Sequence, residues 1–149
     1  MPMHRGSVLL IAAAAFVAGL AVHAAIVAPP AVAAQTANRV FELRTYTAPE
    51  GKLDALNARF RDHTLGLFKK HGITNIGYWT PQDAPTSQNT LIYLIAHPSR
   101  EAAKKSWAAF QADPDWQKAR AASQVNGSLT VQGGVVSVFL TPTDYSPMK

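Results

Sequence analysis

The chain contains no cysteine, and this absence sets the first limits on its chemistry. Without thiols it can form no disulfide, hold no thiolate-ligated metal and use no cysteine nucleophile. Several motifs of known chemistry are missing too: there is no G-x-S-x-G turn, no phosphate-binding loop and no dinucleotide fingerprint. No group of His, Asp and Glu residues has metal-ligand spacing. The sequence therefore predicts no metal site and no bound cofactor.

Charge is also sparse, and it is scattered along the chain. Only 15% of the 149 residues are charged, and the net charge of +5 is not gathered in any run of five like charges. Basic pairs such as Lys104-Lys105 are typical of a solvated helix face. The pattern argues against a nucleic-acid-binding role. The large apolar fraction, 48%, indicates a folded chain of about one domain.

The first 34 residues differ in kind from the rest. A short basic start at His4 and Arg5 precedes an alanine-rich apolar run at 8–28, which ends near small residues of the kind that signal peptidase favours. This pattern predicts a bacterial secretory signal peptide at 1–34, a short linker at 35–39 and a periplasmic or secreted mature protein. The alternative is an uncleaved membrane anchor, because the run is long enough to cross a bilayer. The weak hydrophobicity of alanine favours cleavage.

The remainder of the chain alternates between strand and helix patterns. Strands are expected at 41–46, 73–80, 90–97 and 135–142, and helices at 49–71 and 99–112, with a further helix capped by Asp113. The order is β-α-β-β-α-β. It predicts an α+β protein of the ferredoxin-like class, with an antiparallel sheet and helices on one face.

Both faces of this sheet look apolar. The strand at 90–97 offers Ile92 and Leu94 to one side and Leu91 and Ile95 to the other. A sheet with one face in water would alternate apolar and polar residues instead. We expect a second copy of the chain to cover the face that the helices leave open, giving a homodimer in the form of a dimeric α+β barrel.

The first strand, "FELRTY", carries a line of polar side chains. Alternation along a strand places Glu42, Arg44 and Tyr46 on one face and Phe41 and Leu43 on the other. We expect the apolar pair to face the helices, so that the polar line faces the covered side. Other residues expected beside that line are Tyr93, His97, Ser137, Phe139 and either Trp79 or Tyr78, because the phase of the strand at 73–80 is ambiguous.

A mostly apolar cavity with a few convergent polar groups is typical of a ligand site. Arg44 could orient an anionic ligand, with Tyr46, Trp79 and Tyr93 as the walls of the cavity. Glu42 and His97 are the candidates for moving a proton. The competing interpretation of Glu42 and Arg44 is a structural ion pair, within the chain or across the dimer.

Five segments in the right order carry a resemblance to a known family. The segments "VFELRTYTAPEGKLDAL", "HTLGLFKKHG", "GYWTP", "SWAAFQADPDWQKAR" and "TPTDYSP" together resemble a NIPSNAP domain covering 40–147. The resemblance implies a ferredoxin-like subunit of the dimeric α+β barrel type. It implies no particular reaction, since the family has none that is generally accepted. The mitochondrial association of animal members is not carried over, because the leader of this chain is of the export type.

Two functional hypotheses follow. The first is an exported homodimer that binds a small apolar or anionic ligand, or that acts through interactions, with membrane contact only if the leader stays attached. The alternative is a small cofactor-independent enzyme of the monooxygenase or isomerase type, with a pocket on the barrel face of the sheet. The resemblance allows both, because dimeric α+β barrels include such enzymes as well as pure ligand binders, and fold does not decide function.

Overall fold

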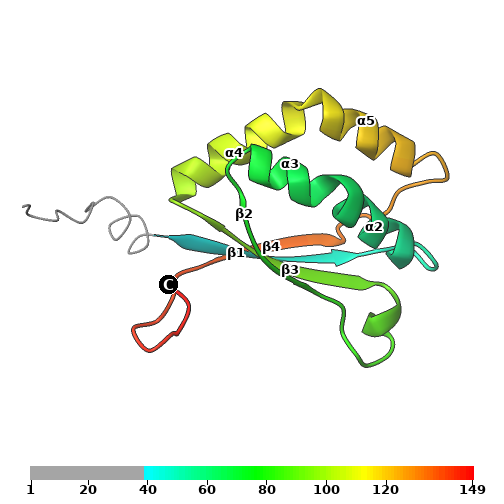
Figure 1. Cartoon of the computed structure of the whole chain (residues 1–149). Helices are drawn as coiled ribbons and strands as arrows, with labels where there is room; N and C mark the ends of the chain where they lie inside the picture. The colour runs from blue at the N-terminus through cyan, green and yellow to red at the C-terminus, as the bar shows by residue number, and fades with distance from the viewer. Residues whose placement is uncertain (1–38) are drawn as a thin grey trace, which may run out of the picture.

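The computed structural model describes residues 39–149, which form one antiparallel sheet covered on one side by helices (Figure 1). The strands are β1 (Val40–Thr47), β2 (Thr74–Trp79), β3 (Thr90–His97) and β4 (Val135–Leu140), in the spatial order β2-β3-β1-β4. The helices are α2 (Leu53–Arg59), η1 (Phe60–Thr64), α3 (Leu65–Lys70), the short η2 (Thr86–Gln88), α4 (Arg100–Ala112) and α5 (Pro114–Ser123). The predicted ferredoxin-like α+β fold is confirmed. The leader and most of the linker lie outside the described residues.

Local signals in the sequence start the later helices where they were expected. The Ser99 hydroxyl accepts a hydrogen bond from the Ala102 amide at 3.0 Å and so caps α4. The Asp113 carboxylate caps α5 by accepting from the Asp115 amide at 2.8 Å, and Pro114 occupies the first turn. The predicted cap at Asp113 is confirmed, and both caps depend only on residues close in the chain.

The helix expected at 49–71 is not continuous. It is interrupted by η1, a π-helical turn at Phe60–Thr64, where the hydroxyl of Thr64 donates to the carbonyl of Arg59 at 3.2 Å. A π-turn inserts an extra residue and changes which side chains share a face. Arg59 and Phe60, on either side of the start of this turn, are both buried.

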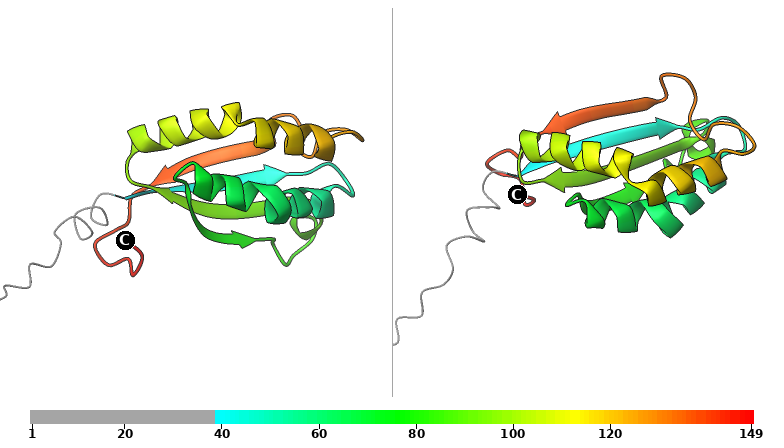
Figure 2. Two further views of the ribbon diagram at one scale, coloured as in Figure 1. Left: turned by 45° about the horizontal axis from the view of Figure 1, so that its top comes forward. Right: turned by 90° about the horizontal axis from the view of Figure 1, so that it is seen from above.

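The core between helices and sheet is rich in aromatic rings. Phe60 lies 5.1 Å from Tyr93 and Phe68 lies 4.9 Å from Phe110, measured between ring centroids. Offset and edge-to-face pairs of this kind add to the stabilisation that burial already supplies. The helices lie directly over the sheet when the molecule is seen from above (Figure 2).

The predicted orientation of β1 is wrong. Glu42, Arg44 and Tyr46 do share a face, but that face lies under the helices: Glu42 accepts a hydrogen bond from Trp107 of α4 at 2.7 Å. The ring of Tyr46 lies 5.8 Å from that of Phe60 in η1. These polar side chains can lie under the helices because α4 supplies the indole of Trp107, which donates to Glu42 and lies beneath the guanidinium group of Arg44. Glu42 and Arg44 also pair with each other, so neither charge is left unpaired.

The orientation of β2 is settled by an irregularity in its pairing. Its register on β3 shifts between Asn75 and Gly77, which leaves Ile76 as an extra residue. A bulge of this kind reverses the phase of the strand beyond it. Tyr78 therefore faces the helices and stacks on Tyr93 at 5.3 Å, whereas Trp79 lies on the opposite face.

The face without helices is apolar, as expected. On β4, Val136 and Val138 are 54% and 48% exposed, and Trp79 on the far strand is 53% exposed. Register pairing places Leu43 and Leu94 between them. The described chain alone leaves most of this face open, and only the C-terminal segment packs near its end, forming a small hollow with Phe41, Leu94 and Leu140. None of the helices at 39–149 is long and apolar enough to cross a membrane.

Candidate functional site

A buried carboxylate lies at the centre of the polar line. Glu42 is 1% exposed, and its two oxygens accept four hydrogen bonds: from Arg44 and Ser137 at 2.6 Å each, from Trp107 at 2.7 Å and from His97 at 3.1 Å. Burial alone would raise the pKa of Glu42, but these donors outweigh it and lower its pKa from 4.5 to about 2. Glu42 is therefore an anion at neutral pH.

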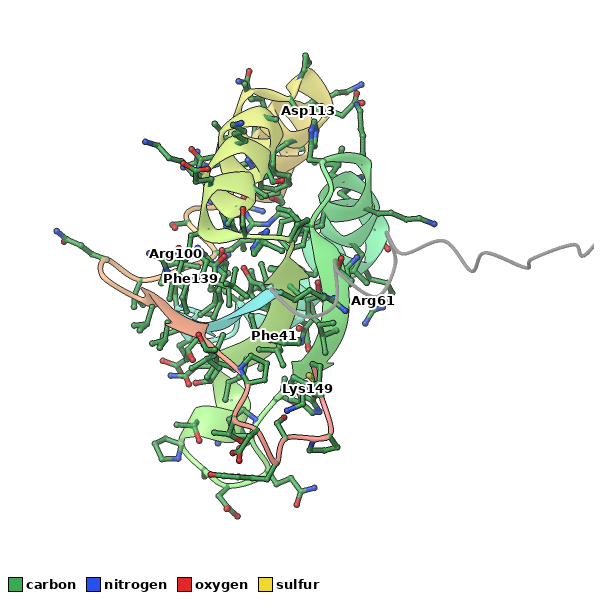
Figure 3. The ribbon with its side chains drawn as sticks, turned by 90° about the vertical axis from the view of Figure 1, so that its left-hand side faces the viewer. Phe41, Arg61, Arg100, Asp113, Phe139 and Lys149 are labelled. Carbon is green, nitrogen blue, oxygen red and sulfur yellow. The ribbon has the colours of Figure 1, made fainter. Side chains whose placement is uncertain are left out.

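His97 adds little that a ligand could reach. Its ring is fully buried. Nε2 forms a hydrogen bond with Glu42, and Nδ1 has no hydrogen-bond partner among the described residues. Its outer neighbour is Phe139, at 6.3 Å, and Arg100 lies in turn over the Phe139 ring at 3.5 Å (Figure 3). The structure thus brings together the two residues predicted to move protons, but it encloses them.

Arg44 connects the buried carboxylate to an open cleft. One terminal nitrogen donates to Glu42, the other lies 3.4 Å from the hydroxyl of Tyr46, and Nε has no partner among residues 39–149. The guanidinium lies over the ring of Trp107, 4.4 Å from its centroid. Burial would lower the pKa of Arg44, but Tyr93, Tyr46 and Glu42 together raise it above its usual range. The side chain is a fixed cation.

The cleft lies between β1 and the helices α4 and α5, with a volume of about 550 Å³, in the range of small-molecule sites. It is lined by Arg44, Tyr46, Trp107, Phe110, Gln111, Trp116, Gln117 and Arg120. This lining combines two guanidinium groups, two indoles and two amides, and it contains no carboxylate. Such a surface suits a small organic anion with an aromatic or otherwise planar body.

A second layer of polar groups lies behind this lining. Arg59 is 6% exposed, and its Cζ lies 5.3 Å from the centroid of the Trp116 ring. Burial and the nearby Arg120 lower the pKa of Arg59, although Tyr46 opposes them. The hydroxyl of Tyr93 has no hydrogen-bond partner among the described residues, and burial beside Tyr46 raises its pKa, so the phenol stays protonated.

The structure does not bring all of the residues predicted for the ligand cavity into one cleft. Arg44 and Tyr46 line the cleft, and Tyr93 lies behind Tyr46, 5.3 Å away between ring centroids. Trp79 is on the other side of the sheet and takes no part in this cleft. No group of three His, Cys, Asp or Glu residues within 39–149 could hold a metal ion.

Six of the eight residues that line the cleft were not predicted as site residues, and neither was Arg59 behind them. Trp107 and Trp116 pack against the core and also line the cleft. Arg120 lies one helical turn beyond Trp116, a spacing that could have marked a shared face of α5. Arg59 follows Leu56 by three residues and so shares the buried face of α2, but an arginine at such a position is normally expected to reach solvent.

Comparisons with known proteins agree with the fold. The model of the NIPSNAP family matches residues 41–147. A NIPSNAP family protein of unknown function from Agrobacterium tumefaciens is 21% identical, with a TM-score of 0.64, over 76% of this chain and 96% of its own. A NIPSNAP-like domain protein from Burkholderia xenovorans is 20% identical, with a TM-score of 0.63, over 74% and 90% of the two chains.

A more distant likeness extends to an enzyme. SnoaB, a cofactor-independent oxygenase from Streptomyces nogalater, is 13% identical, with a TM-score of 0.50, over 74% of this chain and 99% of its own. Identity at this level reflects a shared fold only. No curated protein matches the sequence.

Proposed function

The chain belongs to the NIPSNAP family, and from that premise we propose that it is a homodimeric protein that binds a small organic anion with an aromatic body, one per subunit, in the cleft beneath α4 and α5. The observation that carries the proposal is the composition of that cleft. The cleft has a volume of about 550 Å³ and is lined by two guanidinium groups and two indoles, with no carboxylate among its lining residues.

The charges around the cleft favour an anionic ligand. Arg44 is balanced by Glu42, with which it forms an ion pair at 2.6 Å. Arg120 and the buried Arg59 take part in none of the ion pairs among residues 39–149, so the region keeps an excess of positive charge. The flat guanidinium groups match carboxylate and phosphate oxygens, and the indoles offer faces on which a ring can stack.

The dimer part of the proposal rests on the open face of the sheet. The residues of β1, β3 and β4 that point away from the helices are uncharged: Phe41, Leu43, Thr45, Ile92, Leu94, Ala96, Val136, Val138 and Leu140. An uncharged apolar surface is compatible with a copy of itself, and covering it removes apolar area from water. We expect light scattering at micromolar concentration to give twice the subunit mass.

The export part of the proposal rests on the leader at 1–34. We expect the mature protein to begin near residue 35 and to occur in the periplasm or outside the cell. N-terminal sequencing of the protein recovered from a periplasmic extract would test this, and recovery of the full-length chain in the membrane fraction would favour the uncleaved anchor.

The enzymatic alternative receives less support from the geometry. A monooxygenase or isomerase of the predicted type would use Glu42 or His97 to move a proton. The carboxylate of Glu42 already accepts hydrogen bonds from four donors, and its pKa of about 2 makes Glu42 a weak base. The ring of His97 is fully buried. Binding without turnover is therefore the role that the site supports best.

The direct test of binding uses a model ligand and a charge-matched control. We expect 2-naphthoate to bind the wild-type protein in calorimetry, and Arg120→Gln to weaken binding about fivefold or more, because an anion loses one partly exposed cation. Arg61→Gln removes the same charge from an exposed position on η1 that does not line the cleft, and should leave binding unchanged. Equal affinity of all three proteins, or no binding of the naphthoate at millimolar concentration, would refute the proposal.

A further inference from the structure

We propose that Arg59 binds the charged group of the ligand, a carboxylate or phosphate, behind Trp116, while Arg44 and the indoles hold its body. The inference rests on the proposed binding function and goes beyond it by naming the residue and the chemical group that determine which ligands are accepted.

The first observation is a buried cation without a partner. The side chain of Arg59 is 6% exposed, its Nε lacks any hydrogen-bond partner in the described part of the chain, and no carboxylate there forms an ion pair with it. An unpaired buried charge costs several times more than an exposed one, so buried guanidinium groups are normally paired. The missing partner is an anion.

The second observation is what surrounds Arg59. Tyr46, Tyr93, Trp116 and Arg120 are its polar and aromatic neighbours, and none of them supplies a negative charge. The carboxylate of Glu42 is already engaged by four donors. Residues 39–149 therefore offer this cation no anion of their own, and a ligand that enters the cleft could provide one.

The third observation is how the backbone holds the residue. Arg59 is the last residue of α2 and directly precedes the π-turn η1, and both it and Phe60 are buried. Its carbonyl accepts from the hydroxyl of Thr64 at 3.2 Å. π-turns carry a cost in backbone geometry and occur frequently at functional sites. Leu53, Leu56 and Arg59 are the buried residues of α2 and recur every three residues, so the helix itself directs the guanidinium group inward.

The fourth observation is the position of Arg59 directly behind the lining of the cleft, which Arg59 itself does not line. Trp116 lines the cleft, and Arg59 lies over its ring. Arg120 follows one turn later on α5 and also lines the cleft. An oxyanion beside the Trp116 ring could thus be contacted by two guanidinium groups from different helices, an arrangement that suits both carboxylate and phosphate.

The test compares a charged ligand with its neutral analogue. We expect the wild-type protein to bind 2-naphthoate about tenfold or more tightly than 2-naphthamide, because hydrogen bonds to charged groups are the stronger ones. Arg59→Met should reduce this ratio to about twofold while leaving the affinity for the amide unchanged. Arg61→Met, an exposed site on the neighbouring turn, should preserve the ratio.

A structural role for Arg59 predicts a different result. Replacing an unpaired buried cation by methionine removes a desolvation cost, so we expect the melting temperature of Arg59→Met to be equal to or above that of the wild type. A variant that melts well below the wild type and keeps its preference for naphthoate would overturn the inference, while the binding function of the cleft would stand. Failure of the wild type to bind either compound would instead refute the proposed function, and the inference with it.

A measurement on the unmodified protein covers the case in which Arg59→Met does not fold. The buried Nε–H of Arg59 should give a resolved NMR signal that moves on addition of naphthoate and stays in place with naphthamide. A signal that responds equally to both compounds would overturn the inference. Repeating the titration with 2-naphthyl phosphate decides between the two oxyanions, since the tighter binder identifies the group that the site prefers.

Discussion

Replacing Glu42 by Gln tests the electrostatic core of the site most sharply. The change keeps the shape of the side chain but removes its charge and turns one acceptor into an amide donor. Glu42 is 1% exposed and faces four donors, so an amide cannot satisfy all of them. Arg44 would also lose its ion-pair partner.

The magnitude follows from the pKa of the carboxyl group. A pKa lowered from 4.5 to about 2 means that the folded state prefers the charged form. At about 1.4 kcal/mol per pKa unit, this preference contributes on the order of 3 kcal/mol to the free energy of unfolding. We expect Glu42→Gln to lose a comparable amount at pH 7, in line with the breaking of a buried pair.

The sign of the pH dependence is also fixed. Because the pKa of Glu42 is lowered on folding, its contribution is present above pH 4.5 and is lost as the pH falls toward about 2. The difference in stability between wild type and variant should therefore shrink across that window.

Urea unfolding followed by circular dichroism, at pH 7 and at several values down to pH 3, measures this difference. The exposed Glu101→Gln on α4 is the matched control and should change stability by about 0.5 kcal/mol or less. A loss below about 1 kcal/mol for Glu42→Gln at pH 7, or a loss that does not depend on pH, would refute the reasoning.

Two further predictions concern the surfaces around the site. Val138→Lys places a charge on the open sheet face, halfway along its edge strand β4, and should turn the dimer into a monomer in light scattering, whereas Val125→Lys, at an exposed position outside the sheet, should not; two dimeric variants would argue that another surface forms the dimer. Asp113→Ala removes both the cap of α5 and the partner of His71, whose Nε2 lies 2.6 Å from the carboxylate, so it should lower the melting temperature more than Asp115→Ala does. Equal shifts for the two aspartates in a thermal scan would contradict the role given to the cap.

Features that depend on residues close in the chain could be predicted from the sequence, whereas features that depend on contacts between distant residues could not. Alternation along β1 correctly grouped Glu42, Arg44 and Tyr46, but it could not say which face the helices would cover, because both faces of the sheet are apolar. The deciding contact is the hydrogen bond from Trp107, which is 65 residues away in the chain. The two-residue alternation of a strand shows which side chains share a face, but not which face packs against the helices.

The same limit explains the missed parts of the cleft. The sequence could not decide between Trp79 and Tyr78, because the phase of the strand at 73–80 is ambiguous; the register shift after Asn75 places Tyr78 under the helices and Trp79 on the open face. Arg59 and Arg120 come from separate helices and become neighbours only through packing. By contrast, the caps at Ser99 and Asp113 were predictable because each is a local hydrogen bond.

The three tryptophans allow one measurement of the central claim, that an organic anion binds beneath the helices. Trp107 and Trp116 line the cleft, whereas Trp79 lies on the opposite side of the sheet. In a titration of the ¹⁵N-labelled protein with 2-naphthoate, the account predicts that the indole N–H signals of Trp107 and Trp116 shift while that of Trp79 stays in place. A shift of the Trp79 signal alone, or of none of the three, would contradict it.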